Sequence, residues 1–289
     1  MKKSKVGLLY ILPWLIGFIF LTAYPFLNAL VTSFTDYNLI GSAHFVGIKN
    51  YLTLFSEKDF IKSLNNTFLY TLLTVPLQLA FSLLVAFILN FELKGIRFYR
   101  TAYYIPSILG GNVAVAVLWR FMFQQNGVVN YILGSIGIAP VSWFSRPVGA
   151  MTIVILLKIW QFGSSMLIFL AALKNVPKEL YEAADVDGAK KFRQFFTITM
   201  PLITPTIFFN LVMQLNNAFQ EFNGPYLVTG NGPLNATYMT SMFIYDNAFK
   251  YYRMGYASAA SWVLFGIIVF ITLILFGTQN KWVFYSDEG

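Results

Sequence analysis

One stretch decides the fold class: residues 63–91 read SLNNTFLYTLLTVPLQLAFSLLVAFILNF and contain no Asp, Glu, Lys or Arg. A helix needs about 20 consecutive, mostly apolar residues to cross the hydrocarbon core of a bilayer. This run is long enough. The sequence therefore predicts a transmembrane helix at roughly residues 66–90.

Five further runs have the same character, and only the run that holds Lys158 contains a charged residue: 6–35, 101–119, 147–173, 194–220 and 254–280. We therefore predict an all-α integral membrane protein with six transmembrane helices in a single domain, residues 1–289. The spans are expected at roughly 7–34, 66–90, 101–122, 148–172, 202–222 and 256–279. Two more charge-free stretches, 121–145 and 222–245, carry Asn, Gly and Pro turn residues and are expected to be loops.

Composition agrees with a membrane protein and excludes several chemistries. Hydrophobic residues make up 57% of the 289 positions and charged residues 11%, which does not fit a soluble domain. The chain has no Cys and one His, His44, so disulfides, thiol nucleophiles and multi-His metal sites are excluded. We predict no catalytic residue and no metal site, and the net charge of +8 must be assigned to sides of the membrane.

Basic residues predict the orientation. Six spans put both termini on one side, and that side receives 12 of the 20 Lys and Arg residues, against seven on the other. Cytoplasmic loops carry the excess of Lys and Arg in membrane proteins. Both termini, and the loop at residues 174–201 between the fourth and fifth spans, are therefore expected in the cytoplasm.

That cytoplasmic loop has an informative residue order. Pro177 can open a helix, Glu179 and Glu182 follow where a helix N-terminus favours anions, and Gly188 can end it. The loop is expected to hold a short helix outside the membrane. The order continues as Glu182-Ala183-Ala184, Asp187-Gly188-Ala189, Ile198 and Pro201.

This order resembles the EAA loop of permease subunits of binding-protein-dependent ATP-binding-cassette importers, with Met200 where many relatives have Leu. In that family the loop forms a coupling helix that sits in a cleft of a cytoplasmic ATPase. The resemblance implies an ATPase-coupling role for Glu182, Ala183, Ala184, Asp187, Gly188, Ala189, Ile198 and Pro201. The alternative is an unrelated cytoplasmic helix that happens to contain Glu-Ala-Ala.

Other stretches are similar to the sugar-type permeases of the maltose, multiple-sugar and glycerol-phosphate importers: Leu12-Pro13, Tyr24-Pro25, residues 47–51, residues 229–233 and residues 255–260. The chain looks like the first of two unlike permeases. The resemblance implies a second homologous permease, two copies of the ATPase, an outside sugar-binding protein and a saccharide substrate, in a prokaryotic plasma membrane surrounded by lipid. Contact with the binding protein is expected at Thr229, Gly230, Asn231, Gly232 and Pro233, although these residues also suit a plain turn.

The chain lacks a Gly-x-x-x-x-Gly-Lys-Ser/Thr phosphate loop, so we expect it to be a transport subunit and not an enzyme. ATP and Mg²⁺ are expected on the partner ATPase, with no cofactor in this chain. No nucleic-acid partner is expected.

The fifth span carries a polar stripe: Asn210, Gln214, Asn217 and Glu221 fall on one face of a helix. Polar side chains inside a bilayer face protein or a water-filled cavity, and amides can bond sugar hydroxyls. The resemblance adds Trp160, Gln161 and Ser164 of the fourth span to this predicted substrate site. These groups can instead form hydrogen bonds between helices.

Lys158 lies deep inside the fourth span and needs a partner there. It can pair with Glu221, or it can meet an acidic or phosphorylated sugar such as a uronate oligosaccharide or glycerol phosphate. Two other classes of protein were weighed: an ion-coupled secondary transporter, and a membrane-embedded transferase or protease. Few acidic residues lie in the spans, and the sequence offers little for metal or nucleophilic chemistry.

Overall fold

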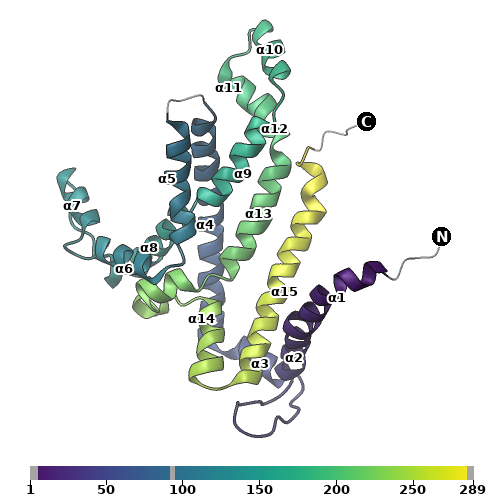
Figure 1. The fold of residues 1–289 in the computed structure, drawn as a ribbon. Coiled ribbons are helices and arrows are strands. Elements are labelled where there is room, and N and C mark those ends of the chain that lie inside the picture. The colour runs from purple at the N-terminus through teal and green to yellow at the C-terminus, as the bar shows by residue number, and fades with distance from the viewer. Residues whose placement is uncertain (1–5, 92–94, 285–289) are drawn as a thin grey trace. The chain divides into compact units, whose positions relative to one another are not determined.

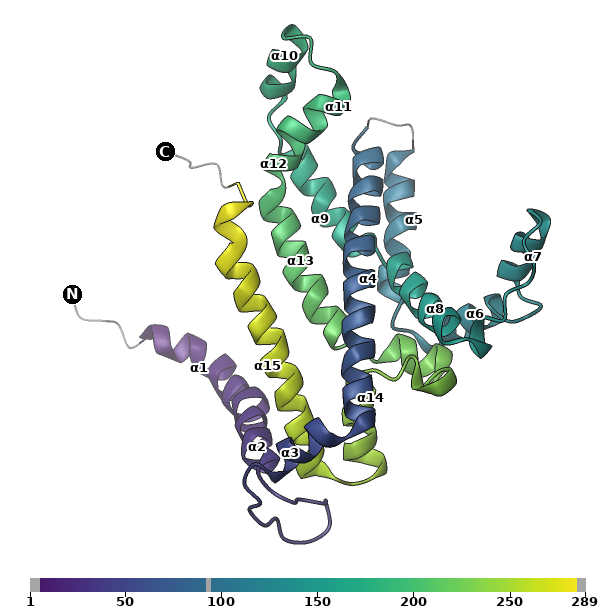
Figure 2. The ribbon, with the colours of Figure 1, turned by 180° about the vertical axis from the view of Figure 1, so that it is seen from behind.

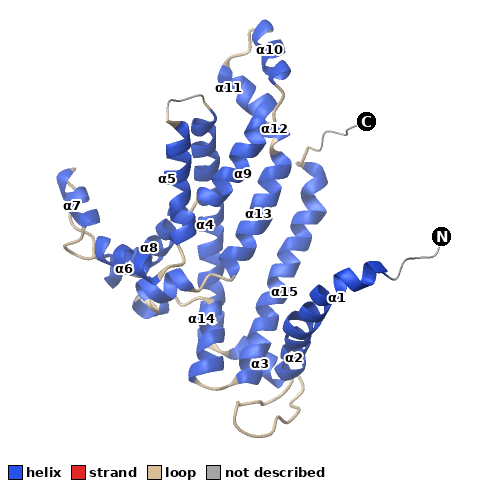
Figure 3. Cartoon of the chain, in the orientation of Figure 1, coloured by secondary structure: helices blue, strands red, loops and turns tan. Residues whose placement is uncertain are grey.

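The computed structural model describes residues 6–91 and 95–284. Figure 3 shows helices joined by loops throughout this part of the chain. The extended pairing found there is a single isolated bridge, Thr35 with Phe45. The chain forms two compact units, one made of residues 1–61 and 241–266, the other of residues 62–240 and 267–289.

The first unit contains the N-terminal helices and the start of the last long helix. Its elements are α1 (Val6–Phe18), η1 (Ile19–Ala23), α2 (Tyr24–Ser33), α3 (Lys49–Ser56), η6 (Asp246–Lys250) and the first half of α15 (Met254–Thr278). The π-helical turn η1 precedes Pro25, which has no N–H to continue the α-helical ladder, and it interrupts the α-helical pattern within one continuous span, Tyr10–Ser33.

Gly255 is required where α15 begins. Its N–H donates to the carbonyl of Tyr37 at 2.9 Å, and a Cβ on Gly255 would lie 2.0 Å from the carbonyl oxygen of Thr35. Only glycine permits so close a backbone approach. Further along α15, the Trp262 ring packs on Phe26 of α2 at 4.7 Å between centroids.

The second unit holds the remaining helices (Figure 1). They are α4 (Lys58–Asn90), α5 (Ile96–Leu109), α6 (Val113–Met122), α7 (Val128–Ser135), η2 (Trp143–Ser145), α8 (Pro147–Trp160), α9 (Gly163–Lys174), α10 (Lys178–Val186), α11 (Lys191–Gln194), η3 (Phe195–Thr199), α12 (Met200–Leu202), α13 (Thr204–Phe219), η4 (Pro225–Thr229), η5 (Pro233–Asn235), α14 (Thr240–Tyr245) and η7 (Gln279–Lys281). α4 and α14 begin or end across the boundary between the units.

The predicted six-span, all-helical fold is confirmed in outline. Three described helices are long and apolar enough to cross a membrane alone, and three pairs of shorter helices bring the number to six if each bent pair is one span. The pairs are α5 with α6, bent by 102°, α8 with α9, bent by 42°, and the α11–α12 segment with α13, bent by 64°.

The third span differs from the straight helix predicted at 101–122. α5 begins earlier, at Ile96, and the chain turns sharply after Leu109. Gly110 and Gly111 interrupt the ladder, and Asn112 opens α6 because its side chain accepts the Ala114 N–H at 2.9 Å. The predicted run therefore contains a break that its apolar composition conceals.

The two stretches expected to be loops contain short helices. α7 occupies Val128–Ser135, and η4 and the start of α14 occupy parts of 222–245. The turn residues that predicted loops lie at the helix ends: Gly127 precedes α7, and Gly230 follows η4 with a φ of +62°. These residues mark the ends of the short helices but do not prevent the helices from forming.

Helix α4 carries the main buried face of the second unit, and both Figure 1 and Figure 2 show α5 running beside it. Its buried residues include a polar set at helical spacing: Ser63, Thr67, Thr71, Thr74, Gln78 and Ser82. Because each is buried, this stripe faces protein and not lipid. Within the stripe, Gln78 and Ser82 donate to the backbone of the broken fourth span, and Thr67 lies 3.0 Å from Thr240.

Candidate functional site

The predicted coupling helix is α10, and its end has a defined cap. α10 begins directly after Pro177 and ends at Val186. Gly188 has a φ of +73°, its N–H donates to Asp185 O at 3.1 Å, and the N–H of Ala189 donates to Ala184 O at 2.9 Å. This pair of bonds is a Schellman cap, which favours glycine at the left-handed position. The Asp-Gly-Ala sequence therefore ends α10 for a physical reason.

Most of α10 is open to solvent. Glu182 and Ala183 are exposed, and Val186 is 89% exposed. In Figure 1, α10 lies beyond the ends of α9 and α12 within its unit. The helix therefore presents its motif residues Glu182 and Ala183 to solvent.

A network of side chains holds α10 against the segment that follows it. Asp185 accepts two contacts of 3.0 Å from Lys191 Nζ and one of 2.5 Å from Gln194 Nε2, which also donates to Ala189 O at 3.0 Å. The hydrogen bond from Lys191, and then that from Gln194, hold the pKa of Asp185 below its ordinary value of 3.8. Gln194 is buried, which makes it the fixed element of this network.

A second bond joins α10 to the entry of the fifth span. The hydroxyls of Tyr181 and Thr199 lie 2.7 Å apart. Thr199 ends the π-helical turn η3, whose wide geometry precedes Pro201, a residue without an N–H. This bond connects α10 to η3, which leads through α12 into α13. Sequence reasoning missed Tyr181, Asp185, Gln194 and Thr199, because none belongs to the motif.

The structure divides the predicted polar stripe of α13. Asn210 and Gln214 are buried, and Gln214 donates to Ser165 of α9 at 2.8 Å. Asn210 donates to Thr206 O of its own helix at 3.2 Å. Asn217, by contrast, is exposed. Gln214 therefore forms a hydrogen bond between helices, which was the alternative to a substrate contact.

The exposed face of α13 carries amides that the stripe did not include. At about 100° per residue, Asn216, Asn217 and Gln220 lie on one side with Phe209 and Met213. Phe209, Met213, Asn217 and Gln220 are exposed, and Asn216 is half-buried. Amides on an open face within a bilayer face water or another protein. The spacing of the amides predicted the exposed face of α13 only approximately. Spacing alone does not show which side of a polar stripe packs against a neighbouring helix.

The predicted residues of the fourth span meet at the break between α8 and α9. Gln78 of α4 and Ser107 of α5 both donate to Gln161 O, at 3.2 and 3.0 Å, and Ser82 donates to Phe162 O at 3.2 Å. These bonds satisfy the backbone groups that a broken helix leaves free. Hydrogen bonds from α4 and α5 therefore stabilise the break between α8 and α9.

The side chains at this break also have partners. Gln161 Nε2 donates to Gly110 O at 3.2 Å, and the Ser164 N–H donates to Ser107 Oγ at 3.1 Å. Trp160 packs beside Trp119, with ring centroids 5.4 Å apart, against the core cluster of the unit. In this arrangement Trp160 and Gln161 support the break, and Ser164 is exposed.

Lys158 and Glu221 form an ion pair. Lys158 Nζ lies 2.9 Å from Glu221 Oε2, and the two side chains are 17% and 14% exposed. Glu221 Oε1 also accepts the Gly224 N–H at 3.1 Å, so the carboxylate fixes the turn after α13. The pair joins the fourth span to the end of the fifth.

The segment that follows the loop Thr229–Pro233 is bonded to the N-terminal part of α4. Asn66 Nδ2 donates to Asn235 O at 2.7 Å and to Tyr238 O at 3.0 Å, and Lys62 Nζ bonds to Leu234 O. Within the loop, the Thr229 and Thr237 hydroxyls lie 2.8 Å apart. The first residue of the loop is therefore tied to the segment that follows it.

Metal binding has no support in the described residues: no three His, Cys, Asp or Glu side chains there come together.

Comparison with known proteins gives the family. The model of the binding-protein-dependent transport system inner membrane component matches residues 46–283. The chain belongs to this family. It is thus a multi-pass membrane permease component of a transport system, and not a catalytic subunit.

Relatives of this permease cover nearly the whole chain. The probable ABC transporter permease protein YesP of Bacillus subtilis is 46% identical over 99% of this chain and 94% of its own length. The sulfoquinovosyl glycerol transport system permease protein SmoG of Agrobacterium fabrum is 36% identical over 87% of this chain and 82% of its own. The alternatives of a secondary transporter and of a membrane enzyme are set aside by this membership.

The fold of the permease is shared with a solved structure. The bacterial alginate ABC transporter, in complex with an alginate pentasaccharide-bound periplasmic protein, contains a chain that superposes with a TM-score of 0.79 at 25% identity. The match covers 95% of this chain and 94% of that one.

Proposed function

We propose that this permease imports a saccharide or glycoside into the cytoplasm, driven by ATP hydrolysis on separate ATPase subunits. The observation that carries the proposal is the similarity, over most of both chains, to permeases of a sulfoquinovosyl glycerol and an arabinooligosaccharide transport system. The alginate transporter of shared fold carries an acidic polysaccharide.

The proposed assembly has a second permease, two ATPase copies that bind ATP and Mg²⁺, and an outside binding protein. Both termini and α10 lie in the cytoplasm in this proposal, because Lys and Arg concentrate on that side. Binding of ATP would move α10 at Glu182–Gly188. The hydrogen bonds of Gln194 and Tyr181 would carry that movement to α12 and α13.

The proposed substrate face lies on the open side of α13. Asn217 and Gln220 are exposed there, and amides both donate and accept hydrogen bonds, as sugar hydroxyls require. Gln214 would act behind this face by holding α13 to α9, with Asn210 on the same buried side. Trp160, Gln161 and Ser164 would hold the break between α8 and α9 in position. Loop Thr229–Pro233 is the proposed contact of the binding protein.

Recognition of an acidic sugar by Lys158 has little support, since Glu221 already neutralises the ammonium at 2.9 Å. An acidic substrate remains compatible with the relatives, but another cation would have to bind it.

The test is uptake by the complete complex in lipid vesicles, supplied with its binding protein, using neutral and uronate oligosaccharides of equal length. Asn217→Leu should lower uptake of every accepted sugar with little effect on basal ATP hydrolysis. Leu215→Ala, on the same helix, is the control. Lys158→Gln should affect neutral and acidic sugars equally. Unchanged uptake in Asn217→Leu would rule out the proposed substrate face. If Lys158→Gln lost uptake of acidic sugars alone, Lys158 would have a role in recognising the charge of the substrate.

A further inference from the structure

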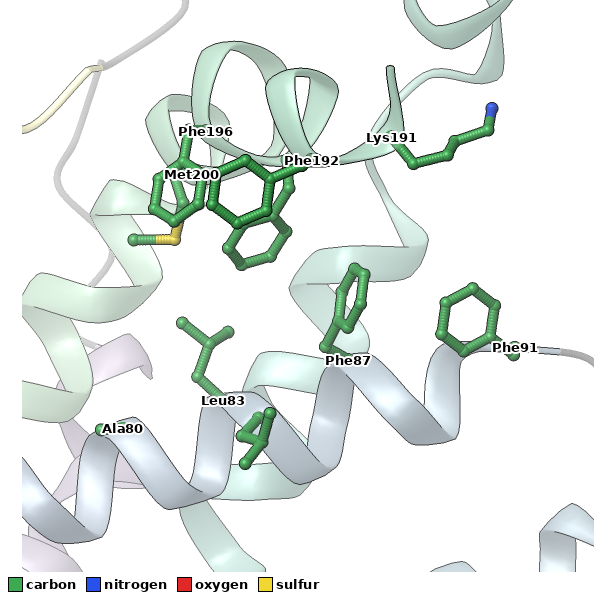
Figure 4. A pocket seen from close by; sticks show the side chains of 10 residues that line it. Ala80, Leu83, Phe87, Phe91, Lys191, Phe192, Phe196 and Met200 are labelled. Carbon is green, nitrogen blue, oxygen red and sulfur yellow. The ribbon is translucent and has the colours of Figure 1, made fainter.

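An apolar groove lies between the end of α4 and the segment that leads into α13 (Figure 4). We call it the inner groove. Its volume is about 580 Å³, within the size range of small-molecule sites. The lining residues are Ala80, Leu83, Leu84, Phe87 and Phe91 from α4, and Lys191, Phe192, Phe195, Phe196 and Met200 from the other side.

The walls of the inner groove are built by aromatic packing. Phe87 meets Phe195 edge to face at 4.9 Å between centroids, and Phe192 meets Phe196 at 4.8 Å. Figure 4 shows the side chains of Phe192 and Phe196 on one wall facing Leu83 and Phe87 on the other. The groove is therefore defined by packed rings.

Large apolar surface is left open in this groove. Phe192 is 78% exposed and Phe196 is 53% exposed. Exposed apolar area of this extent is unfavourable in water, so the groove needs an apolar occupant. The occupant can be a lipid chain or a protein.

Position and charge favour a lipid. The groove begins in the predicted second span and ends at Phe91, where the basic cytoplasmic residues start, so it lies at the inner boundary of the bilayer in the proposed orientation. Lys191 is the charged residue in its lining, and Arg193 of the same short helix is exposed. At the α4 end, Arg100 donates to Leu89 O at 3.1 Å.

Among the described residues, Asp185 is an acidic group in contact with this basic edge. Asp185 takes two contacts from Lys191 Nζ, which still has a third N–H to donate. Among the described residues, Arg193 on the same short helix and Arg100 beside the end of α4 add positive charge. Cytoplasmic leaflets carry anionic lipid, which basic residues at the membrane surface attract.

We propose that the inner groove binds an anionic phospholipid such as phosphatidylglycerol. One acyl chain lies along Leu83, Leu84 and Phe87, and the phosphate lies at Lys191 and Arg193. The lipid would then bridge α4 and the segment between α10 and α13. This site goes beyond the proposed transport function and depends on it only for the leaflet.

The experiment uses the full chain in vesicles that contain phosphatidylglycerol with a photoactivatable acyl chain, and maps the adducts by mass spectrometry. Adducts are expected on the groove residues Phe87, Phe195 and Phe196. Phosphatidylcholine with the same acyl chain should label them less by at least about fivefold, the effect of one basic residue at a membrane surface.

Two variants with matched controls locate the chain and the headgroup. Leu84→Trp should fill the groove and remove its adducts, whereas Leu72→Trp, on an exposed part of the same helix, should not. Lys191→Gln should reduce the preference for phosphatidylglycerol, whereas Lys174→Gln, at the end of α9, should leave it.

Equal labelling by the two lipids would overturn the proposal, as would adducts spread evenly over α4 and unaffected by Leu84→Trp. Adducts that disappear when the second permease is co-expressed would assign the groove to a protein interface and overturn it as well. Uptake assays play no part in this test, so its failure leaves the transport function untouched.

Discussion

Separating Lys158 from Glu221 should destabilise the permease strongly, because both charged side chains are mostly buried. At 2.9 Å, two unit charges attract by about 6 kcal/mol at an effective dielectric constant of about 20. Desolvation offsets much of that attraction, so the intact pair contributes little net stability. Removal of one partner is different, since it leaves the other charge in a mostly buried place.

Lys158→Met and Glu221→Gln should therefore each cost about 3 kcal/mol. The double variant buries no uncompensated charge, so its loss should fall below the sum of the two. The interaction energy should be roughly 2–3 kcal/mol, at the upper end for residues in contact. Unfolding of the purified chain in mixed micelles of rising SDS content, followed by tryptophan fluorescence, measures all three losses.

The Lys191–Asp185 pair is the control, because its side chains are 77% and 53% exposed. The same cycle there should give a much smaller coupling, since exposed ion pairs are screened by water. The reasoning fails if the Lys158 and Glu221 losses are each below about 1 kcal/mol and simply add. In that case the two charges would be solvated in the membrane, and Lys158 would be available to a substrate.

Three further predictions concern the helices that transmit movement. Gln214→Leu should cost about 1 kcal/mol in the same SDS titration, as should Ser165→Ala, and the double variant should cost no more than either, because one 2.8 Å bond is lost in each case. Additive losses would contradict that bond. Gly188→Ala should cost about 1–2 kcal/mol, since the position has a φ of +73° and open space around it, and it should uncouple ATP hydrolysis from uptake; full coupling would contradict the role of the cap. The lowered pKa of Asp185 means that its contacts stabilise α10 above pH 3.8 and are lost as pH falls through the lowered value, which a carbon-13 NMR titration can follow. Gln194→Leu should move that pKa upward toward 3.8, and an unmoved titration would show that Gln194 does not hold the carboxylate.

Apolar runs predicted the helices well and their breaks poorly. The runs at 63–91 and 254–280 each became one long helix, although Pro76 removes one ladder hydrogen bond from the first. The third and fourth spans are bent because Gly110 and Gln161 lie where the chain turns, and neighbouring helices supply the missing hydrogen bonds. Such partners come from distant sequence, so a run of apolar letters does not reveal them.

The candidate site was predictable in part. The motif located α10, and the positive φ of Gly188 explains why glycine stands there. The spacing of amides identified α13 as a polar helix, but it could not separate the packed Gln214 from the open Asn217, because both fall within one stripe. Gln194 gave no signal in the sequence, since a single buried amide outside the motif resembles any other polar residue.

The central claim is that this chain is a permease that an ATPase drives through α10. Its most direct test is purification of the tagged chain from membranes, followed by an ATPase assay of wild type, Glu182→Ala and Gly188→Asp. The account predicts that a second permease and an ATPase co-purify, and that both variants lose the ATPase or uncouple its activity from the loaded binding protein. Recovery of the chain alone, stable and unaffected by either change, would contradict it.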